Sequence, residues 1–256
     1  MALTIKFNSP LKGLIPEPEP VINHIPKAYK QLSNSVDSNT VKKCMPFLDA
    51  MISGYILPIP VDYRYTYNFS EQRAIFDTNT NLPEHLKKYF EIGFHDNRQI
   101  SEELMYENRT INAVFKFINN WHIETPKGYS CLYTQPFNKK SPFKVIDGIV
   151  DTDNFFTSVN LPFYWTSPVE KEVIIKAGSP MCLIFPFRRE SWTMKTYKKE
   201  EKIEDRMNFF REVFENYKKH SWKKRAIDEI LHFWYTKLRH TIYKKISRFK
   251  FFCRKQ

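Results

Sequence analysis

Short stretches in which hydrophobic and polar residues alternate fill the middle of the chain. Between residues 110 and 187 these stretches are separated by turns rich in Pro, Asn, Asp and Gly. They recur at intervals of about ten residues, which is typical of a sandwich or barrel-like all-β core. We therefore expect strands over residues 114–118, 121–123, 129–134, 143–149, 156–161, 172–175 and 181–187.

Weaker patterns precede this region. We expect a short helix that starts after Lys43, because Pro46 limits how early it can begin, and that ends at Gly54. A pair of strands follows within residues 55–67, and a second short helix is predicted over residues 82–92. These elements would lie beside the β core or form part of it.

The two ends of the chain differ from its centre. Residues 1–39 are rich in Pro and Asn, and Pro alternates with Glu over residues 16–20, which predicts an extended arm. Residues 199–219 and 223–250 carry hydrophobic residues at spacings of three and four, as amphipathic helices do. We predict an α+β protein with an N-terminal arm (residues 1–39), a mainly-β core (40–192) and a helical region (193–256).

Positive charge is concentrated in the second of these helices. The whole chain carries a net charge of +12, and the last 34 residues hold eleven Lys or Arg against two acids, which gives +9 there. Such a segment suits nucleic acid, an anionic membrane surface or an acidic protein, although a solvated helix face has the same composition. The candidate binding residues are Lys223, Lys224, Arg225, Lys237, Arg239, Lys244, Lys245 and Arg248.

The spacing of the cysteines and the hydropathy of the chain indicate the cellular compartment in which we expect the protein. The four cysteines, Cys44, Cys131, Cys182 and Cys253, are far apart and form no CxxC pair. The sequence also has no signal peptide and no apolar run long enough to span a bilayer. We expect reduced thiols, a cytoplasmic location and no transmembrane segment.

Three segments of the central region resemble a known superfamily in their order and spacing. They are Pro126-Lys127-Gly128 before the expected strand 129–134, the turn sequence Gly148-Ile149-Val150-Asp151-Thr152-Asp153, and the strand that follows Gly178. Together they look like the trimeric dUTPase and dCTP deaminase superfamily. The resemblance covers residues 127–187 and implies a compact β-clip fold that commonly assembles as a trimer.

The same resemblance implies a site at the turn. In dUTPases the first Asp of this turn orients the attacking water, which would give that role to Asp151 and nucleotide contacts to Gly148, Asp153 and Asn154. A carboxylate held in a tight turn could then act as a general base on a triphosphate bound with Mg²⁺. The alternative is that the two aspartates only cap the turn through side-chain hydrogen bonds.

Several positions that the superfamily uses for catalysis differ in this chain. Asn154 stands where dUTPases have a Tyr under the deoxyribose, and residues 135–138 lack the Arg and Ser of the phosphate-binding loop. The glycine-rich C-terminal arm has no counterpart, and residues 157–160 lack the catalytic Glu of the deaminases. These differences favour a non-catalytic or degenerate member that needs no cofactor or metal.

Two further groups of residues have candidate chemistry. His122 and Glu124 form an H-x-E pair like that of some metal sites, but no further histidine follows until His220, so a third ligand would have to be His220, His85 or His95. Arg188 and Arg189 end the last expected strand beside Trp192. They could clamp a phosphate or carboxylate, or form a structural ion pair and cation–π contact, which we favour.

Similarity to an uncharacterised, mainly phage-associated protein family supplies the remaining context. It lies in residues 43–49, 121–136, 150–153 and 186–192, and it implies no activity. Our leading hypothesis is a phage-encoded structural or accessory protein that forms a homo-oligomer, with a trimer favoured, in the host cytoplasm or the virion. The alternatives are a Mg²⁺-dependent nucleotide enzyme that uses Asp151, and a nucleic-acid-binding protein that uses the basic helix.

Overall fold

The computed structural model describes residues 3–33, 40–78, 82–95 and 110–197. The chain divides into two compact units, Met1–Ser191 and Trp192–Gln256, and every helix and strand described below belongs to the first unit. The expected helices over residues 199–219 and 223–250 lie outside the described residues, as do the eight basic candidates that they contain.

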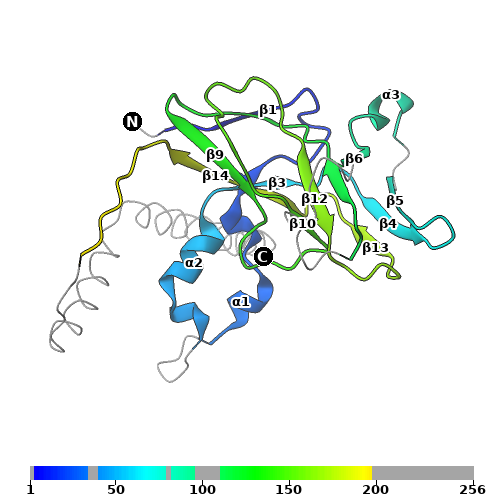
Figure 1. The fold of residues 1–256 in the computed structure, drawn as a ribbon, viewed down its shortest axis with the longest axis horizontal. Coiled ribbons are helices and arrows are strands. Elements are labelled where there is room, and N and C mark those ends of the chain that lie inside the picture. Colours follow the sequence, from blue (N-terminus) through cyan, green and yellow to red (C-terminus); the bar gives the residue numbers. More distant parts are fainter. Residues whose placement is uncertain (1–2, 34–39, 79–81, 96–109, 198–256) are drawn as a thin grey trace, which may run out of the picture. The chain divides into compact units, whose positions relative to one another are not determined.

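The described strands form four antiparallel sheets, and none of these sheets closes into a barrel (Figure 1). The five-stranded sheet has the order β11 (Gly148–Val150), β9 (Tyr129–Thr134), β14 (Pro180–Arg188), β3 (Tyr55–Pro58), β2 (Glu19–Pro20). The four-stranded sheet has the order β10 (Phe143–Val145), β12 (Leu161–Trp165), β7 (Val114–Phe117), β6 (Ile92–His95). Smaller sheets join β13 (Val173–Ile175), β4 (Tyr63–Asn68) and β5 (Arg73–Thr78), and pair β1 (Lys6–Asn8) with β8 (His122–Glu124). The mainly-β expectation is confirmed.

Helices are few and short in the described residues. They are η1 (Val21–His24), α1 (Lys27–Gln31), η2 (Val41–Lys43), α2 (Met45–Ile52) and α3 (Glu84–Lys87). The expected helix before Gly54 is α2, which has Pro46 in its first turn, where proline suits a helix because no N–H bond is lost. Gly54 follows with a φ of +91°, a conformation that turns the chain sharply into β3.

One hydrophobic core is shared by strands from all four sheets. Aromatic side chains dominate it: Phe117 stacks on Phe163 with ring centroids 4.1 Å apart, and Tyr65 stacks on Trp165 at 3.9 Å. These four side chains are no more than 1% exposed. Burial of such large apolar surfaces is the main source of stability for the β domain.

Two strand predictions were wrong in ways that matter for the site. The segment 143–149 is two strands in different sheets, because the chain leaves β10 at residue 145 and enters β11 at Gly148. The segment 156–161 is an exposed loop, and the strand β12 begins only at Leu161. Phe156, the first residue of this expected strand, is 81% exposed.

Residues of the expected N-terminal arm take part in the sheets. β1 pairs with β8, and β2 pairs with the edge of β3. The backbone N–H of Val21 also donates to the carbonyl oxygen of Gly54 at 3.1 Å. These hydrogen bonds tie residues 6–8 and 19–21 to the rest of the β domain at two separate places.

Candidate functional site

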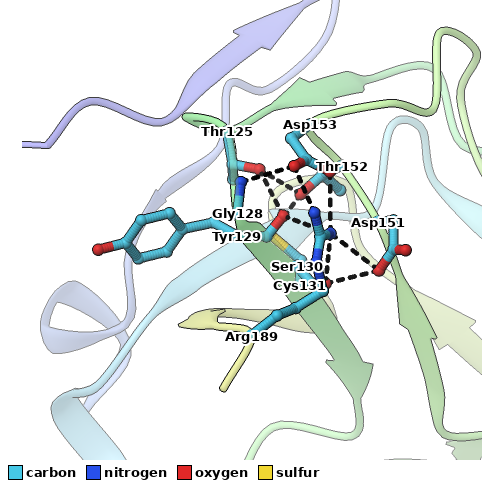
Figure 2. Close-up of polar contacts among 9 residues, drawn as sticks. All are labelled: Thr125, Gly128, Tyr129, Ser130, Cys131, Asp151, Thr152, Asp153 and Arg189. Carbon is cyan, nitrogen blue, oxygen red and sulfur yellow. Dashed lines mark hydrogen bonds and ion pairs between the residues drawn. The ribbon is translucent and has the colours of Figure 1, made fainter. Parts of the chain in front are cut away.

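The turn after β11 and the ends of β9 and β14 form a densely hydrogen-bonded polar cluster (Figure 2). The three strands are neighbours, with β9 in the middle. The register pairs Val150 with Cys131 and Arg188 with Tyr129. One step further along, Asp151 lies opposite Ser130 and Arg189 lies opposite Gly128, so these residues meet at one end of the sheet.

The turn itself is held by backbone hydrogen bonds. The carbonyl oxygen of Asp151 accepts from the N–H groups of Asn154 at 2.9 Å and Phe155 at 3.0 Å. Thr152, inside the turn, is 3% exposed. This geometry fixes the direction in which the two aspartate side chains leave the backbone.

Arg189 is the central donor of the cluster. Its Nη1 donates to Oδ1 of Asp153 at 2.9 Å and to Oγ of Ser130 at 3.0 Å, and its Nη2 donates to Oδ2 of Asp153 at 2.5 Å. Nη1 also reaches the carbonyl oxygen of Tyr129 at 3.2 Å. The backbone N–H of Arg189 also donates to the carbonyl oxygen of Gly128 at 2.9 Å. This bond holds the main chain of Arg189 beside the turn that its side chain contacts.

Both carboxylate oxygens of Asp153 are occupied. Besides the two bonds from Arg189, Oδ2 accepts the backbone N–H of Gly128 at 2.7 Å. The pKa of Asp153 lies below its usual value of 3.8, mainly because of the hydrogen bond from Arg189 and next because of the bond from the backbone N–H of Gly128. The side chain of Asp153 is only 2% exposed, whereas that of Arg189 is 34% exposed. This carboxylate is a charged, paired structural group at neutral pH.

Asp151 has a more open environment. Its Oδ1 accepts from Oγ of Ser130 at 2.6 Å and lies 3.0 Å from Nη1 of Arg189. Its side chain is 58% exposed, and no dashed line in Figure 2 reaches its other oxygen. Asp151 is thus the carboxylate of the turn that faces solvent.

A second layer of hydroxyl and thiol groups supports the turn from inside. The hydroxyl groups of Thr125 and Thr152 lie 2.7 Å apart, and the Thr152 hydroxyl donates to the sulfur of Cys131 at 3.4 Å. Burial raises the pKa of Cys131 to about 11, so its thiol is protonated at neutral pH. A buried, protonated thiol is a packing group and not a nucleophile.

The residues assigned to nucleotide binding by resemblance are spread over this turn. Gly148 lies on the edge strand β11, with open space where a Cβ would stand. Asn154 is exposed at the end of the turn. Asp153 does not fit a Mg²⁺ ligand, because both its oxygens already accept hydrogen bonds from Arg189 and Gly128. Of the two carboxylates, Asp151 is the one that retains an exposed oxygen.

Arg189 forms its ion pairs with the turn, through Asp151 and Asp153. Arg188 differs from Arg189: its side chain is 69% exposed and lies 3.4 Å from Glu190 at the surface. Sequence reasoning did not identify Ser130, Thr125 or Thr152 as members of the cluster. Only the register of three strands brings them together, and no spacing in the sequence encodes that register.

Nδ1 of His122 lies 3.9 Å from Oε1 of Glu124, and each of the two residues also has another partner. Nε2 of His122 lies 3.0 Å from the carbonyl oxygen of Phe155, and Oε1 of Glu124 accepts from Asn8 at 2.9 Å. Glu124 also pairs with Lys6 at 3.4 Å. Within the described part of the chain, no three His, Cys, Asp or Glu side chains are grouped as a metal site would need.

Exposed apolar side chains flank the cluster on both sides. Ile149 on β11 is 65% exposed, and Phe155 and Phe156 after the turn are 45% and 81% exposed. The loop that carries them is not loosely attached, because Asp151 and His122 both bind the backbone of Phe155. We call Ile149, Phe155 and Phe156 the turn-flanking apolar residues.

Comparison with known proteins adds no identification. No family model matches the sequence, and no curated protein matches it. Among the residues that the structure describes, no helix has both the length and the apolar character needed to cross a bilayer.

Proposed function

We propose that the β domain is a non-catalytic binding module of the dUTPase-like type, which assembles with copies of itself, with a trimer as the favoured state. The role would be that of a structural or accessory protein, and resemblance to a phage-associated family suggests a phage as its source. This proposal combines the sequence resemblance with the polar cluster at the turn.

The observation that carries the proposal is the double hydrogen bond between Arg189 and Asp153. A catalytic or metal-binding carboxylate needs a free oxygen that faces its substrate or ion. Asp153 has none, whereas Asp151 keeps one exposed oxygen beside the oxygen that Ser130 and Arg189 engage. The paired charges of Asp153 and Arg189 stabilise the fold, which supports a structural role for Asp153 over a catalytic one.

The turn-flanking apolar residues support self-association. Large side chains that are anchored and exposed are typical of protein contacts. Ile149 lies on β11, an edge strand that pairs only with β9 among the described strands. Open strand edges tend to pair with other strands, so a second copy could extend this sheet.

Multi-angle light scattering tests this proposal. We expect the full chain to be an oligomer and Phe156→Ser to shift it towards the monomer. Phe69→Ser is the matched control, because Phe69 is also an exposed phenylalanine (62%) but follows β4, outside the turn. A full chain that stays monomeric over the whole concentration range, or equal behaviour of the two variants, would refute self-association at this surface.

A second candidate is a Mg²⁺-dependent enzyme acting on a nucleotide. The observation in its favour is the 58% exposure of the Asp151 side chain. Incubation with a panel of deoxynucleoside triphosphates and Mg²⁺ would yield a product that Asp151→Asn abolishes. Asp62→Asn is the control, because Asp62 is also an ion-paired aspartate, 2.7 Å from Lys176, and lies outside the turn. Turnover abolished by Asp151→Asn alone would replace the non-catalytic proposal.

A further inference from the structure

The edge strand β11 carries an exposed apolar side chain between two carboxylates. Ile149 is 65% exposed, and Asp147 and Asp151, two residues before and two residues after it, are exposed as well. Side chains two positions apart in a strand point to the same face, so the three residues form a row of roughly 13 Å along β11. No described strand pairs with the outer side of β11, which ends the five-stranded sheet.

Two hydrogen bonds to β9 hold both carboxylates over one face of the sheet. The register of β11 and β9, continued by one residue at each end, places Asp147 opposite Thr134 and Asp151 opposite Ser130. The Thr134 hydroxyl donates to Oδ1 of Asp147 at 2.5 Å, and the Ser130 hydroxyl donates to Oδ1 of Asp151 at 2.6 Å. The positions of the two carboxylates are therefore set by the sheet itself.

The row is negatively charged, although the whole chain carries a net charge of +12. Arg189 reaches Asp151, but it also binds Asp153 through Nη1 and Nη2, so one guanidinium serves two carboxylates. Together with Asp147, these three carboxylates and one guanidinium leave a net charge of −2. Among the described residues, no hydrogen bond reaches the second oxygen of Asp147 or of Asp151. Each of them can therefore accept a cation from outside the domain.

A second β11 strand is a poor partner for this edge. If two β11 strands paired antiparallel about Ile149, Asp147 of each copy would lie opposite Asp151 of the other copy. A parallel pair in the same register would place each aspartate beside its own equivalent. Like charges directly opposite each other destabilise a pair of strands. The charges of the row thus select a strand of opposite charge.

The other edge strands of the described domain do not have this pattern. On β13, Ile174 is also exposed (43%), but Glu172 and Lys176 flank it with opposite charges. Among the described edge strands, only β11 has an exposed apolar residue between two acids. None of these strands has the complementary order, in which a large apolar residue lies between two bases, so they do not supply the matching strand.

We propose that the edge of β11 binds an extended segment of another protein with a basic–apolar–basic pattern. In such a segment, a large apolar residue has Lys or Arg two positions away on each side. Added as a strand, it places its apolar side chain beside Ile149 and its cations beside Asp147 and Asp151. Gly148 has open space where a Cβ would stand, and glycine in a strand often marks the close approach of another backbone. This inference names the ligand of the proposed binding module and rests on that proposal.

Fluorescence polarisation with the full chain and labelled synthetic peptides tests this inference. The probe has the sequence Thr-Lys-Thr-Ile-Thr-Lys-Thr, and Thr-Thr-Lys-Ile-Lys-Thr-Thr is the spacing control. Both peptides have the same composition and charge, so attraction by charge alone would bind them equally. In the control, the lysines of an extended peptide point to the face opposite the isoleucine. We expect the probe to bind about tenfold more tightly than the control, because only the probe makes both ion pairs.

Variants of the row and of β13 provide the matched comparison. Asp147→Asn and Ile149→Ser should each weaken binding of the probe about two- to fivefold, because each removes one cross-strand contact. Ile174→Ser is the control, since Ile174 is also an exposed isoleucine on an edge strand but has no pair of acids around it. It should leave binding unchanged. Asp147→Lys should prefer a probe in which one lysine is replaced by glutamate, and the preferred position of the glutamate gives the strand direction.

The outcomes separate this inference from the proposed self-association. No binding of the probe by a chain whose oligomers respond to Phe156→Ser would overturn the inference and leave self-association in place. A monomeric chain that binds the probe would refute self-association alone. Equal affinity for the two peptides, or for the natural chain and Asp147→Lys, would also overturn the inference. If the probe dissociates oligomers of the full chain and Asp147→Lys is monomeric, a second copy occupies the edge, and another protein is overturned as its ligand.

Discussion

Arg189 and Asp153, 36 residues apart in the chain, are joined by two parallel hydrogen bonds of 2.9 and 2.5 Å. Arg189 follows β14 and Asp153 follows β11, and β9 lies between these strands. The pair therefore links the ends of β11 and β14 across the end of β9. Such two-point binding requires a planar guanidinium, which lysine does not have.

Arg189→Lys should lower the thermal unfolding midpoint although it keeps the positive charge. A lysine can donate to one oxygen of Asp153 but cannot bind Asp153 and Ser130 with the same geometry. Arg188→Lys is the matched control, because Arg188 is 69% exposed and pairs with Glu190 at the surface. Differential scanning fluorimetry should show a drop of several degrees for Arg189→Lys and almost none for Arg188→Lys. Equal midpoints would contradict the role assigned to Arg189.

Asp153→Asn should remove a stabilising contribution that depends on pH. The pKa of Asp153 is lower in the folded than in the unfolded chain, so its contribution is complete above the unfolded value of 3.8. As the pH falls through the folded value, the carboxylate is protonated and the contribution disappears. The difference between the unfolding midpoints of the natural chain and the variant should be constant above about pH 5 and shrink below about pH 4. A difference that does not change with pH would contradict this account.

The strands were predictable where a continuous stretch of alternating residues forms a single strand of a single sheet. The prediction for residues 129–134 matches β9 in full, because this strand is bounded by a glycine turn at Gly128 and by Pro136. The prediction failed after Asp151. There the carbonyl oxygen of Asp151 accepts two backbone N–H groups and closes a turn, so Phe155 and Phe156 lie outside the sheet despite their apolar character.

The candidate site was predictable only in part. The repeated aspartates pointed to the turn, and an ion pair was expected for Arg189. Their connection could not be derived, because it depends on how β11, β9 and β14 are ordered and aligned. The buried amine of Lys139, in the loop between β9 and β10, could not be predicted either, because a single lysine in a polar loop carries no sequence pattern that indicates burial.

The basic residues of the last expected helix predict a salt-dependent interaction if nucleic acid is their partner. Binding of a DNA duplex by the full chain should weaken as salt rises, because each bound phosphate releases counterions. Replacing Lys244, Lys245 and Arg248 by glutamine should reduce the slope of log affinity against log salt by about 0.9 for each phosphate that the variant no longer neutralises. Lys6→Gln, at a surface lysine of β1, is the control. An unchanged slope in the triple variant would remove nucleic acid as the partner of these residues.

Gly54→Ala should destabilise the β domain, whereas Gly148→Ala should be tolerated. A Cβ on Gly54 would lie 2.5 Å from the carbonyl oxygen of Ile184 on β14, and the φ of +91° is strained for any L side chain. Since the obstacle is backbone in the central part of the five-stranded sheet, we expect a loss of about 2 kcal/mol or more in the free energy of unfolding. Gly148 has no described atom within 4 Å of its added Cβ, so its substitution should change stability by less than about 0.5 kcal/mol. Urea unfolding of the two variants measures this difference, and a Gly54→Ala chain as stable as Gly148→Ala would show that β3 and β14 do not approach each other this closely.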